Sequence, residues 1–218
     1  MPDFSILTNN IDMYLEGFKY TVMSSVIALI GSFILGVILA VMRIAPIRIL
    51  NWIGSAFVEF VRNIPLVLIA FIFYFALPVI GITLNGFVAG TVTLTVYTAA
   101  FIAEVIRAGI LSVAKGQMEA ARSSGLTYVQ AMYYVVLPQA VKIVMPPLGN
   151  QFLNLVKNSS ILGIIAGADL MYQGDLISTK TFVTFDVYIF VGMFYLILTI
   201  PLSMLVRYLE KRLAKEAV

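Results

Sequence analysis

Long stretches without a charged side chain constrain this chain more than any other feature of its sequence. The run from Tyr20 to Met42 contains 23 uncharged residues, and about 20 predominantly apolar residues carry a helix across the hydrocarbon core of a bilayer. The run from Asn63 to Ala103 contains 41, enough for two crossings, and Gly81 lies near its middle. Because a spanning segment must satisfy its backbone polar groups internally, these runs predict an all-α integral membrane protein.

The rest of the chain extends this pattern to five transmembrane helices in one domain, residues 1–218. Hydrophobic residues make up 61% of the sequence and the mean hydropathy is +1.00, which is more apolar surface than a soluble domain of this length could bury. The fourth span contains Pro146, Pro147 and Lys157 and is therefore expected to be interrupted. The predicted spans cover approximately residues 20–42, 64–79, 87–106, 143–168 and 187–206.

Lysine and arginine gather in alternate segments of the chain, and this bias predicts an orientation. If the N-terminus is outside, the inner segments collect most of the cations, Arg43, Arg62 and Arg107 among them, while Lys19 and Lys180 remain outside. Short loops rich in Lys and Arg are retained in the cytoplasm. We therefore expect an external N-terminus and a cytoplasmic C-terminus.

Several classes of function lack the residues that they require. The chain has no cysteine and no histidine, which removes thiol nucleophiles, imidazole bases and the usual zinc ligands, so neither a catalytic nor a metal site is expected. No stretch matches the phosphate-binding loop G-x-x-x-x-G-K-[ST], so no cofactor is expected in this chain. The net charge of +3 is small and spread over loops, so neither nucleic acid nor a polybasic lipid-binding block is expected. The lipid bilayer is an expected partner because of the apolar composition. These absences weaken most enzyme chemistries, so an enzyme is not expected.

A polar helix-turn-helix interrupts the apolar sequence between residues 115 and 138. Gly125 is placed to end the first helix in a left-handed conformation, and Thr127 with Gln130 fits a capping box that begins the second. The second helix would carry an apolar face, which lies either on the inner membrane surface or in a groove of a partner protein. That face consists of Val129, Met132, Tyr133 and Val136.

The run GQMEAARSSGLTYVQAMYYVVLPQAVKIVMPPLGNQFLNLVKNSSI, Gly116 to Ile161, closely resembles the EAA loop and the following segment of ABC importer permease subunits for polar amino acids. The segments Glu59–Pro78 and Tyr97–Val113 resemble the same family. The resemblance covers nearly the whole chain and implies a type I ABC importer permease fold in the cell (inner) membrane of a bacterium or archaeon.

The resemblance also implies partners and a mechanism. In this family a cytoplasmic coupling loop, here about residues 115–138, docks on a separate ATP-binding subunit, which holds ATP and magnesium. A second permease subunit completes the pathway. An extracytoplasmic solute-binding protein delivers the amino acid. By this analogy Glu119, Ala120, Ala121 and Gly125 shape the coupling loop. The residues that would contact the ATP-binding subunit are Val129, Met132 and Tyr133.

Polar residues in the fourth span are candidates for the substrate path. Asn150, Asn154 and Lys157 fall at i, i+4 and i+7 and so share one helix face, where Lys157 could bind a carboxylate or pair with Glu104. If Glu104 instead faces the cavity, it would favour a basic substrate. Asn158, Ser159 and Ser160 extend the stripe into an expected break in the helix. Weaker candidates, chosen for polarity at similar depth, are Tyr97, Thr98 and Gln151.

Two other classes of function compete with the importer. A self-contained channel or secondary transporter could use Lys157 in an ion or proton pathway. A membrane anchor without transport activity would need none of these polar residues. A requirement for a co-purifying ATPase separates the importer from both.

Overall fold

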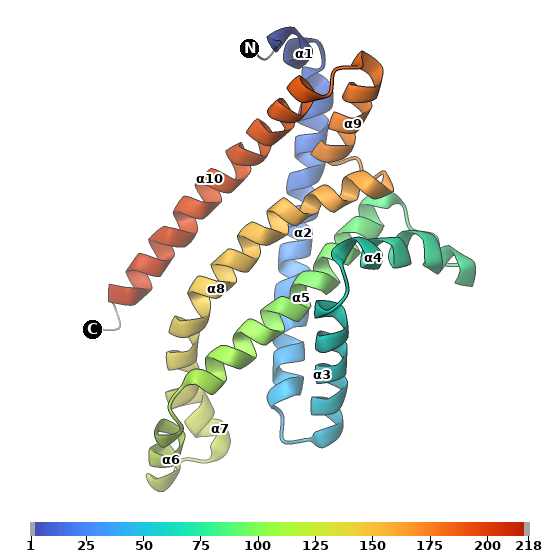
Figure 1. The fold of residues 1–218 in the computed structure, drawn as a ribbon. Coiled ribbons are helices and arrows are strands. Elements are labelled where there is room, and N and C mark those ends of the chain that lie inside the picture. Colours follow the sequence, from blue (N-terminus) through green and yellow to red (C-terminus); the bar gives the residue numbers. More distant parts are fainter. Residues whose placement is uncertain (1–2, 216–218) are drawn as a thin grey trace.

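The computed structural model describes residues 3–215, and this part of the chain is helical with short turns (Figure 1). The α-helices are α1 (Phe4–Asn9), α2 (Ile11–Ile44), α3 (Arg48–Arg62), α4 (Leu66–Phe71), α5 (Gly86–Ser112), α6 (Lys115–Ser123), α7 (Tyr128–Ala131), α8 (Leu137–Asn158), α9 (Leu170–Thr181) and α10 (Phe185–Lys215). Two π-helical segments, η1 (Ile72–Ala76) and η3 (Met132–Val136), and two 3₁₀ segments, η2 (Leu77–Ile80) and η4 (Ser159–Ile165), connect them.

Three helices are long and apolar enough to cross a membrane, and they contain the first, third and fifth predicted spans. Within the described residues these are Ile11–Ile44, Gly86–Ser112 and Phe185–Arg212. The second predicted span lies in a broken element, because α3 and the helical run Leu66–Ile80 are bent by 105° at a short break. The count of five spans and the orientation of the termini stay predictions.

The helix α2 packs along α5 through small side chains. Ala28, Ser32, Gly36 and Ala40 are all buried, and a Cβ added at Gly36 would lie 2.6 Å from the Ile102 side chain. Small residues at four-residue spacing let helix backbones approach closely in lipid. This stripe therefore joins two helices of one chain and is not left free for a second copy.

The prolines of the fourth span do not interrupt it. Pro146 and Pro147 lie inside α8, and the change to 3₁₀ geometry occurs only at Ser159. Proline is tolerated in such a helix where neighbouring helices hold it, and α8 packs closely here: Cβ atoms at Gly109 and Gly149 would clash with Val144 and Val206 at 2.1 and 2.4 Å. The expected break therefore exists, but after the prolines.

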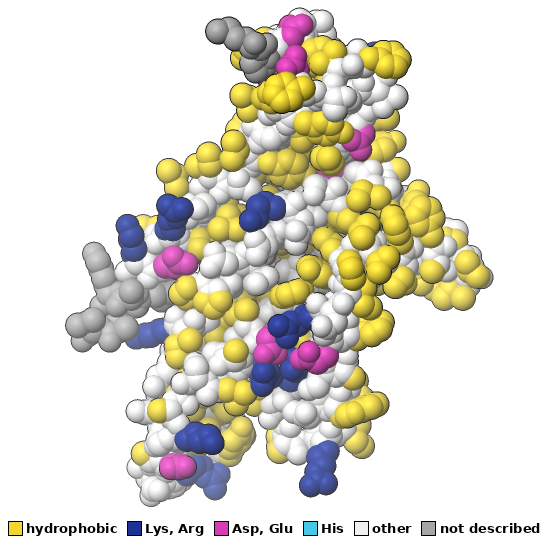
Figure 2. Space-filling view, in the orientation of Figure 1, with side chains coloured by type: hydrophobic (Ala, Val, Ile, Leu, Met, Phe, Trp, Pro, Cys, Tyr) yellow, Lys and Arg dark blue, Asp and Glu magenta, His cyan; other side chains and the backbone are white. Residues whose placement is uncertain are grey.

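The arm formed by α4, η1 and η2 projects away from the bundle (Figure 1). Its surface is apolar: Ile72, Phe75, Val79 and Ile80 are between 46% and 85% exposed, and Figure 2 shows hydrophobic side chains over this side of the molecule. An apolar surface of this kind is stable against lipid or another subunit, not against water.

Candidate functional site

The turn between α6 and α7 has the local geometry that its sequence predicts. Gly125 adopts φ +89°, its N–H donates to the Arg122 carbonyl at 3.1 Å, and the Leu126 N–H donates to the Ala121 carbonyl at 3.2 Å. This pair of bonds is a Schellman motif, which needs a left-handed residue at the position of Gly125. Thr127 then begins the next helix with a complete capping box. Two adjoining caps fix the angle between α6 and α7.

The predicted apolar face of the second helix is divided by the structure. Val129 and Tyr133 are 74% and 64% exposed, whereas Val136 is buried and Met132 packs beside it against Val113. The reason is the π-helical segment that begins at Met132, because a wider helical turn shifts the side-chain register. The exposed side chains, which we call the tyrosine face, are Tyr128, Val129, Tyr133 and Tyr134.

The remaining coupling candidates lie on α6 and its end. Glu119, Ala120 and Gly125 are exposed, while Ala121 is 7% exposed and packs inside the turn. A small residue fits at Ala121 because the side chain is buried in the turn, while its carbonyl accepts the Schellman bond described above. Glu119 and Ala120 are thus accessible, as is the tyrosine face.

A continuous helical path connects this surface to the polar residues of the fourth span. Residues 128–158 are helical throughout as α7, η3 and α8, and Pro138 lies in the first turn of α8 without breaking the path. At the far end, Asn150, Asn154 and Lys157 share a face that no other part of the described chain covers, because all three are exposed. The polar stripe expected from their spacing is therefore present.

Two cavities border this stripe. One, of about 390 Å³, is lined by Lys157 and Arg207 together with Thr199 and Ser203 of α10. The other, of about 260 Å³, lies where α8 ends, and its polar lining is Asn158, Ser160 and Asp175. The first cavity presents two cations and two hydroxyls, which suits a carboxylate group. The second offers the Asn158 amide and the Ser160 hydroxyl beside the Asp175 carboxylate, which accepts a bond from the Tyr188 hydroxyl.

The other substrate candidates differ in accessibility. Ser159 is fully buried and donates its hydroxyl to the Val156 carbonyl at 2.8 Å, and the Ser160 hydroxyl donates to the Lys157 carbonyl at 3.0 Å. Thr98 is 3% exposed inside α5. Tyr97 is half-buried with its ring 4.9 Å from that of Phe101, and Gln151 is half-buried on α8. Thr98 and Ser159 thus have no surface to offer a solute in this conformation.

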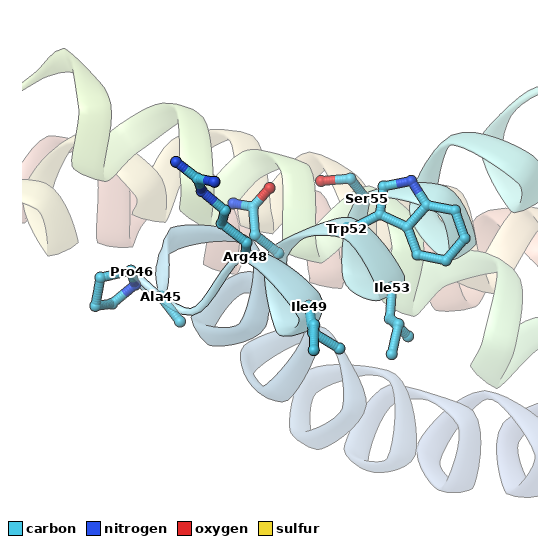
Figure 3. Close-up of a pocket in the computed structure, with 8 residues that line it drawn as sticks. Ala45, Pro46, Arg48, Ile49, Trp52, Ile53 and Ser55 are labelled. Atoms are coloured by element: carbon cyan, nitrogen blue, oxygen red, sulfur yellow. The ribbon is translucent and has the colours of Figure 1, made fainter.

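Another open recess lies away from all these residues, at the turn between α2 and α3 (Figure 3). Its volume is about 860 Å³, and Figure 3 shows Ile49 and Ile53 pointing the same way from α3, with Arg48 and Trp52 pointing in other directions. Trp52 is 72% exposed. A tryptophan beside an arginine at the end of a span is typical of the membrane interface, so this recess is not a solute site.

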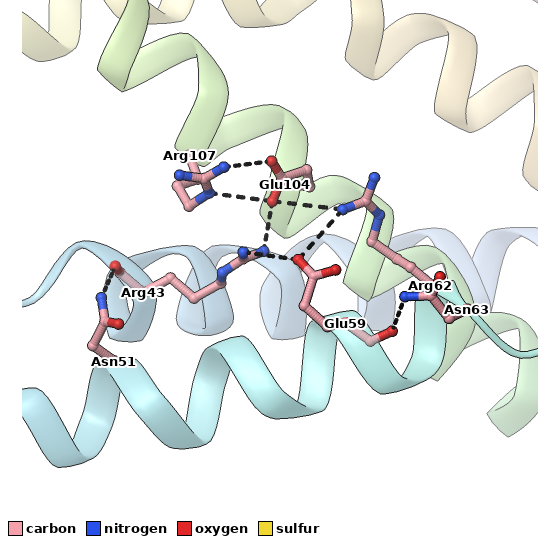
Figure 4. A network of polar contacts seen from close by, with 7 residues as sticks. All are labelled: Arg43, Asn51, Glu59, Arg62, Asn63, Glu104 and Arg107. Atoms are coloured by element: carbon pink, nitrogen blue, oxygen red, sulfur yellow. Dashed lines mark hydrogen bonds and ion pairs between the residues drawn. The ribbon is translucent and has the colours of Figure 1, made fainter.

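Glu104 is the centre of an ion-pair network between α2, α3 and α5 (Figure 4). Its carboxylate lies 2.5 Å from the Arg43 guanidinium, 2.6 Å from that of Arg107 and 3.8 Å from that of Arg62. Glu59 lies 3.2 Å from Arg43. The pairing of Glu104 with Lys157 that we considered does not occur, and Lys157 makes no ion pair within residues 3–215.

Arg43 joins this network although its sequence context gave no sign of it. Its side chain is 7% exposed and lies between Glu59 and Glu104, which are 16 and 61 residues away. Two pairs of this network are local, Glu59 with Arg62 and Glu104 with Arg107, because residues three apart are neighbours on a helix. A partner 61 residues away has no local signal.

Comparison with known proteins places this geometry in a family. Residues 13–215 match the model of the binding-protein-dependent transport system inner membrane component. The chain belongs to that family. The probable glutamine ABC transporter permease protein GlnM of Bacillus subtilis is 69% identical, with 97% of this chain and 98% of that protein covered. The glutamine transport system permease protein GlnP of Escherichia coli is 35% identical, with 97% of each covered.

The solved structures agree on the fold. A crystal structure of an amino acid ABC transporter with histidines has a TM-score of 0.91 at 34% identity and covers 97% of this chain and 99% of that one. The chain is thus a permease subunit of an amino acid ABC importer and a transport component, not an enzyme. It is a multi-pass membrane protein with bacterial relatives, and its family implies an inner membrane location, an ATP-binding subunit and a partner permease. Family membership decides against a self-contained channel and against a passive anchor.

Proposed function

We propose that this chain forms the translocation path for a neutral polar amino acid, glutamine in the first instance. The named function of the GlnM and GlnP relatives supports this choice. So does the structure, because the exposed stripe presents amides, Asn150 and Asn154, and a single cation, Lys157. Glu104, the carboxylate that would favour a basic substrate, is already engaged by arginines.

The observation that carries the coupling mechanism is the unbroken helical path of residues 128–158. The tyrosine face, with Glu119, Ala120 and Gly125 beside it, docks on the ATP-binding subunit, which holds ATP and magnesium. At 1.5 Å per residue, Tyr133 and Asn150 are about 25 Å apart along this path. A displacement of the tyrosine face therefore moves the polar stripe as one body, without a separate transmission element.

The substrate path then runs between this stripe and a second permease subunit. Lys157 binds the carboxylate of the amino acid, and Asn150, Gln151 and Asn154 offer amides to a polar side chain. The cavity that Asn158 and Ser160 line receives the solute from the extracytoplasmic binding protein. Ser159 donates its hydroxyl to the Val156 carbonyl instead, and Thr98 is buried inside α5, so neither side chain faces this path.

Substrate-dependent ATP hydrolysis by the reconstituted complex tests this function. With the binding protein present, a panel of amino acids should stimulate ATPase most strongly for glutamine and weakly for arginine and lysine. Lys157→Ala should abolish the stimulation and leave basal hydrolysis intact, whereas Lys211→Ala, an exposed cation near the end of α10, should change nothing. Equal stimulation by arginine, or an unaffected Lys157→Ala, contradicts the proposal.

A further inference from the structure

The chain turns sharply between α8 and α9 (Figure 1), in a corner formed by residues 166–169. Two residues of this corner, Ala166 and Ala168, have φ values of +55° and +60°, a left-handed conformation that is unfavourable for a residue with a side chain. The corner also lies tightly against α5, because a Cβ added at Gly86 would be 2.6 Å from the Ala166 carbonyl carbon. Its backbone is therefore strained and has little room to relax.

Asp169, the last residue of the corner, brings a charge into the protein without a cation to balance it. Its side chain is fully buried, and none of the ion pairs found in residues 3–215 includes it. Burial raises the pKa of the Asp169 carboxyl to about 6, and the like charge of Asp175 acts in the same direction. The carboxylate thus remains charged at neutral pH, where a buried and unpaired charge lowers the stability of the fold.

Helix capping explains only part of what Asp169 does. Its carboxylate accepts hydrogen bonds from the N–H groups of Met171 and Tyr172, each at 3.1 Å, and so caps the start of α9. Asparagine caps a helix about as well as aspartate and carries no charge. The carboxylate also accepts a third bond, from the Tyr195 hydroxyl of α10 at 3.4 Å. The cap alone therefore does not account for a charged residue here.

Tyr195 connects Asp169 to the break in the fourth predicted span. Its hydroxyl is also within hydrogen-bonding reach of the Ser159 and Thr21 hydroxyls. Ser159 is fully buried and is the first residue of the 3₁₀ segment η4, while Thr21 of α2 accepts a bond from the Leu170 N–H at 3.0 Å. We call Thr21, Ser159, Asp169 and Tyr195 the buried polar cluster. It joins α2, η4, α9 and α10 through one carboxylate.

The buried polar cluster lies directly behind the wall of a solute cavity. Ser159 is flanked by Asn158 and Ser160, which line the cavity of about 260 Å³. Opposite them, η4 and α9 approach closely, because a Cβ added at Gly163 would be 3.0 Å from the Met171 side chain. Any displacement of Ser159 or of the start of α9 therefore changes the shape of this cavity.

We propose that Asp169 is a positioning residue for transport, whose charged carboxylate holds the buried polar cluster together and so keeps Asn158 and Ser160 at the wall of the solute cavity. The inference rests on the proposed function, in which this cavity receives the solute. Backbone strain and an unpaired charge meet within four residues, and costs of this kind are concentrated at functional sites. A side chain that is retained at the expense of stability serves activity and not folding.

The test compares two variants by ATP-dependent glutamine uptake into proteoliposomes that contain the complete transport complex. Asp169→Asn keeps the size and the cap but removes the charge. It should reduce uptake by about tenfold or more and raise the thermal unfolding midpoint of the purified permease subunit by about 2–4 °C. Tyr195→Phe should also reduce uptake but lower the midpoint, because the buried carboxylate loses a donor. A shared loss of uptake with opposite shifts of the midpoint separates positioning from stability.

The matched control is Glu210→Gln, which makes the same change of charge at a position of α10 that solvent reaches; uptake and midpoint should both stay at the wild-type values. Unaltered uptake in Asp169→Asn overturns the inference. A lowered midpoint in Asp169→Asn also overturns it, since Asp169 would then only stabilise the fold. In either case glutamine uptake by the wild type still supports the proposed function, whereas its absence in the wild type refutes the proposed function itself.

Discussion

Replacing Gly125 tests whether the left-handed turn of the coupling loop is required for docking. Its φ is +89°, and a Cβ added there would meet nothing within 4 Å, so a substitution acts through backbone strain and not through a clash. The strain is about 1–2 kcal/mol for a residue with a Cβ, and a β-branched side chain belongs at the upper end. Because the turn is exposed, it relieves that strain by leaving the docking conformation. At about 1.4 kcal/mol per factor of ten, the docking-competent fraction falls about 5- to 30-fold.

The assay is the affinity of the purified ATP-binding subunit for the solubilised permease, measured by titration for a graded series. Gly125→Val should weaken binding by about 5- to 30-fold, Gly125→Ala by somewhat less, and Gly125→Asn least, since asparagine tolerates the left-handed region. Gly116→Val is the matched control, because Gly116 has equally open surroundings and no positive φ. Equal affinity for Gly125→Val and the wild type would refute the reasoning, and so would an equal loss in Gly116→Val.

Two further predictions concern stability, read from the thermal unfolding of the purified subunit in detergent. Glu104→Gln should lower the free energy of unfolding by about 3 kcal/mol, because the Arg43 side chain, which is 7% exposed, loses its nearest carboxylate. Glu59→Gln should lower it by about 1 kcal/mol or less, because the Glu59 side chain is 54% exposed. Equal losses would show that burial does not set the energy of this network. Gly36→Ala should destabilise by about 1–3 kcal/mol by forcing α2 from α5, whereas Gly192→Ala, where a Cβ meets nothing within 4 Å, should stabilise by about 0.5–1 kcal/mol. A higher midpoint for Gly36→Ala would contradict the packing.

The local features of the candidate site were predictable because their signals lie within a few residues of one another. Gly125 ends a helix and Thr127 starts the next through hydrogen bonds that span at most five residues. The polar stripe follows in the same way from the helical period of α8. In contrast, the spacing of Val129 and Met132 suggested one shared face, and the π-helical segment at Met132 separated them.

The sequence alone determined that the chain lies in lipid, that it is helical and how the coupling loop turns. The free energy of transfer into lipid is a sum over single residues, and helix capping involves only near neighbours in the chain. Only the tertiary structure decided that Glu104 pairs with Arg43 and not with Lys157, that α3 and the run Leu66–Ile80 are bent by 105°, and which face of α8 stays uncovered. These outcomes depend on which distant segments pack together. Such contacts arise from the shape and charge of whole helices, and no short window of sequence contains that information.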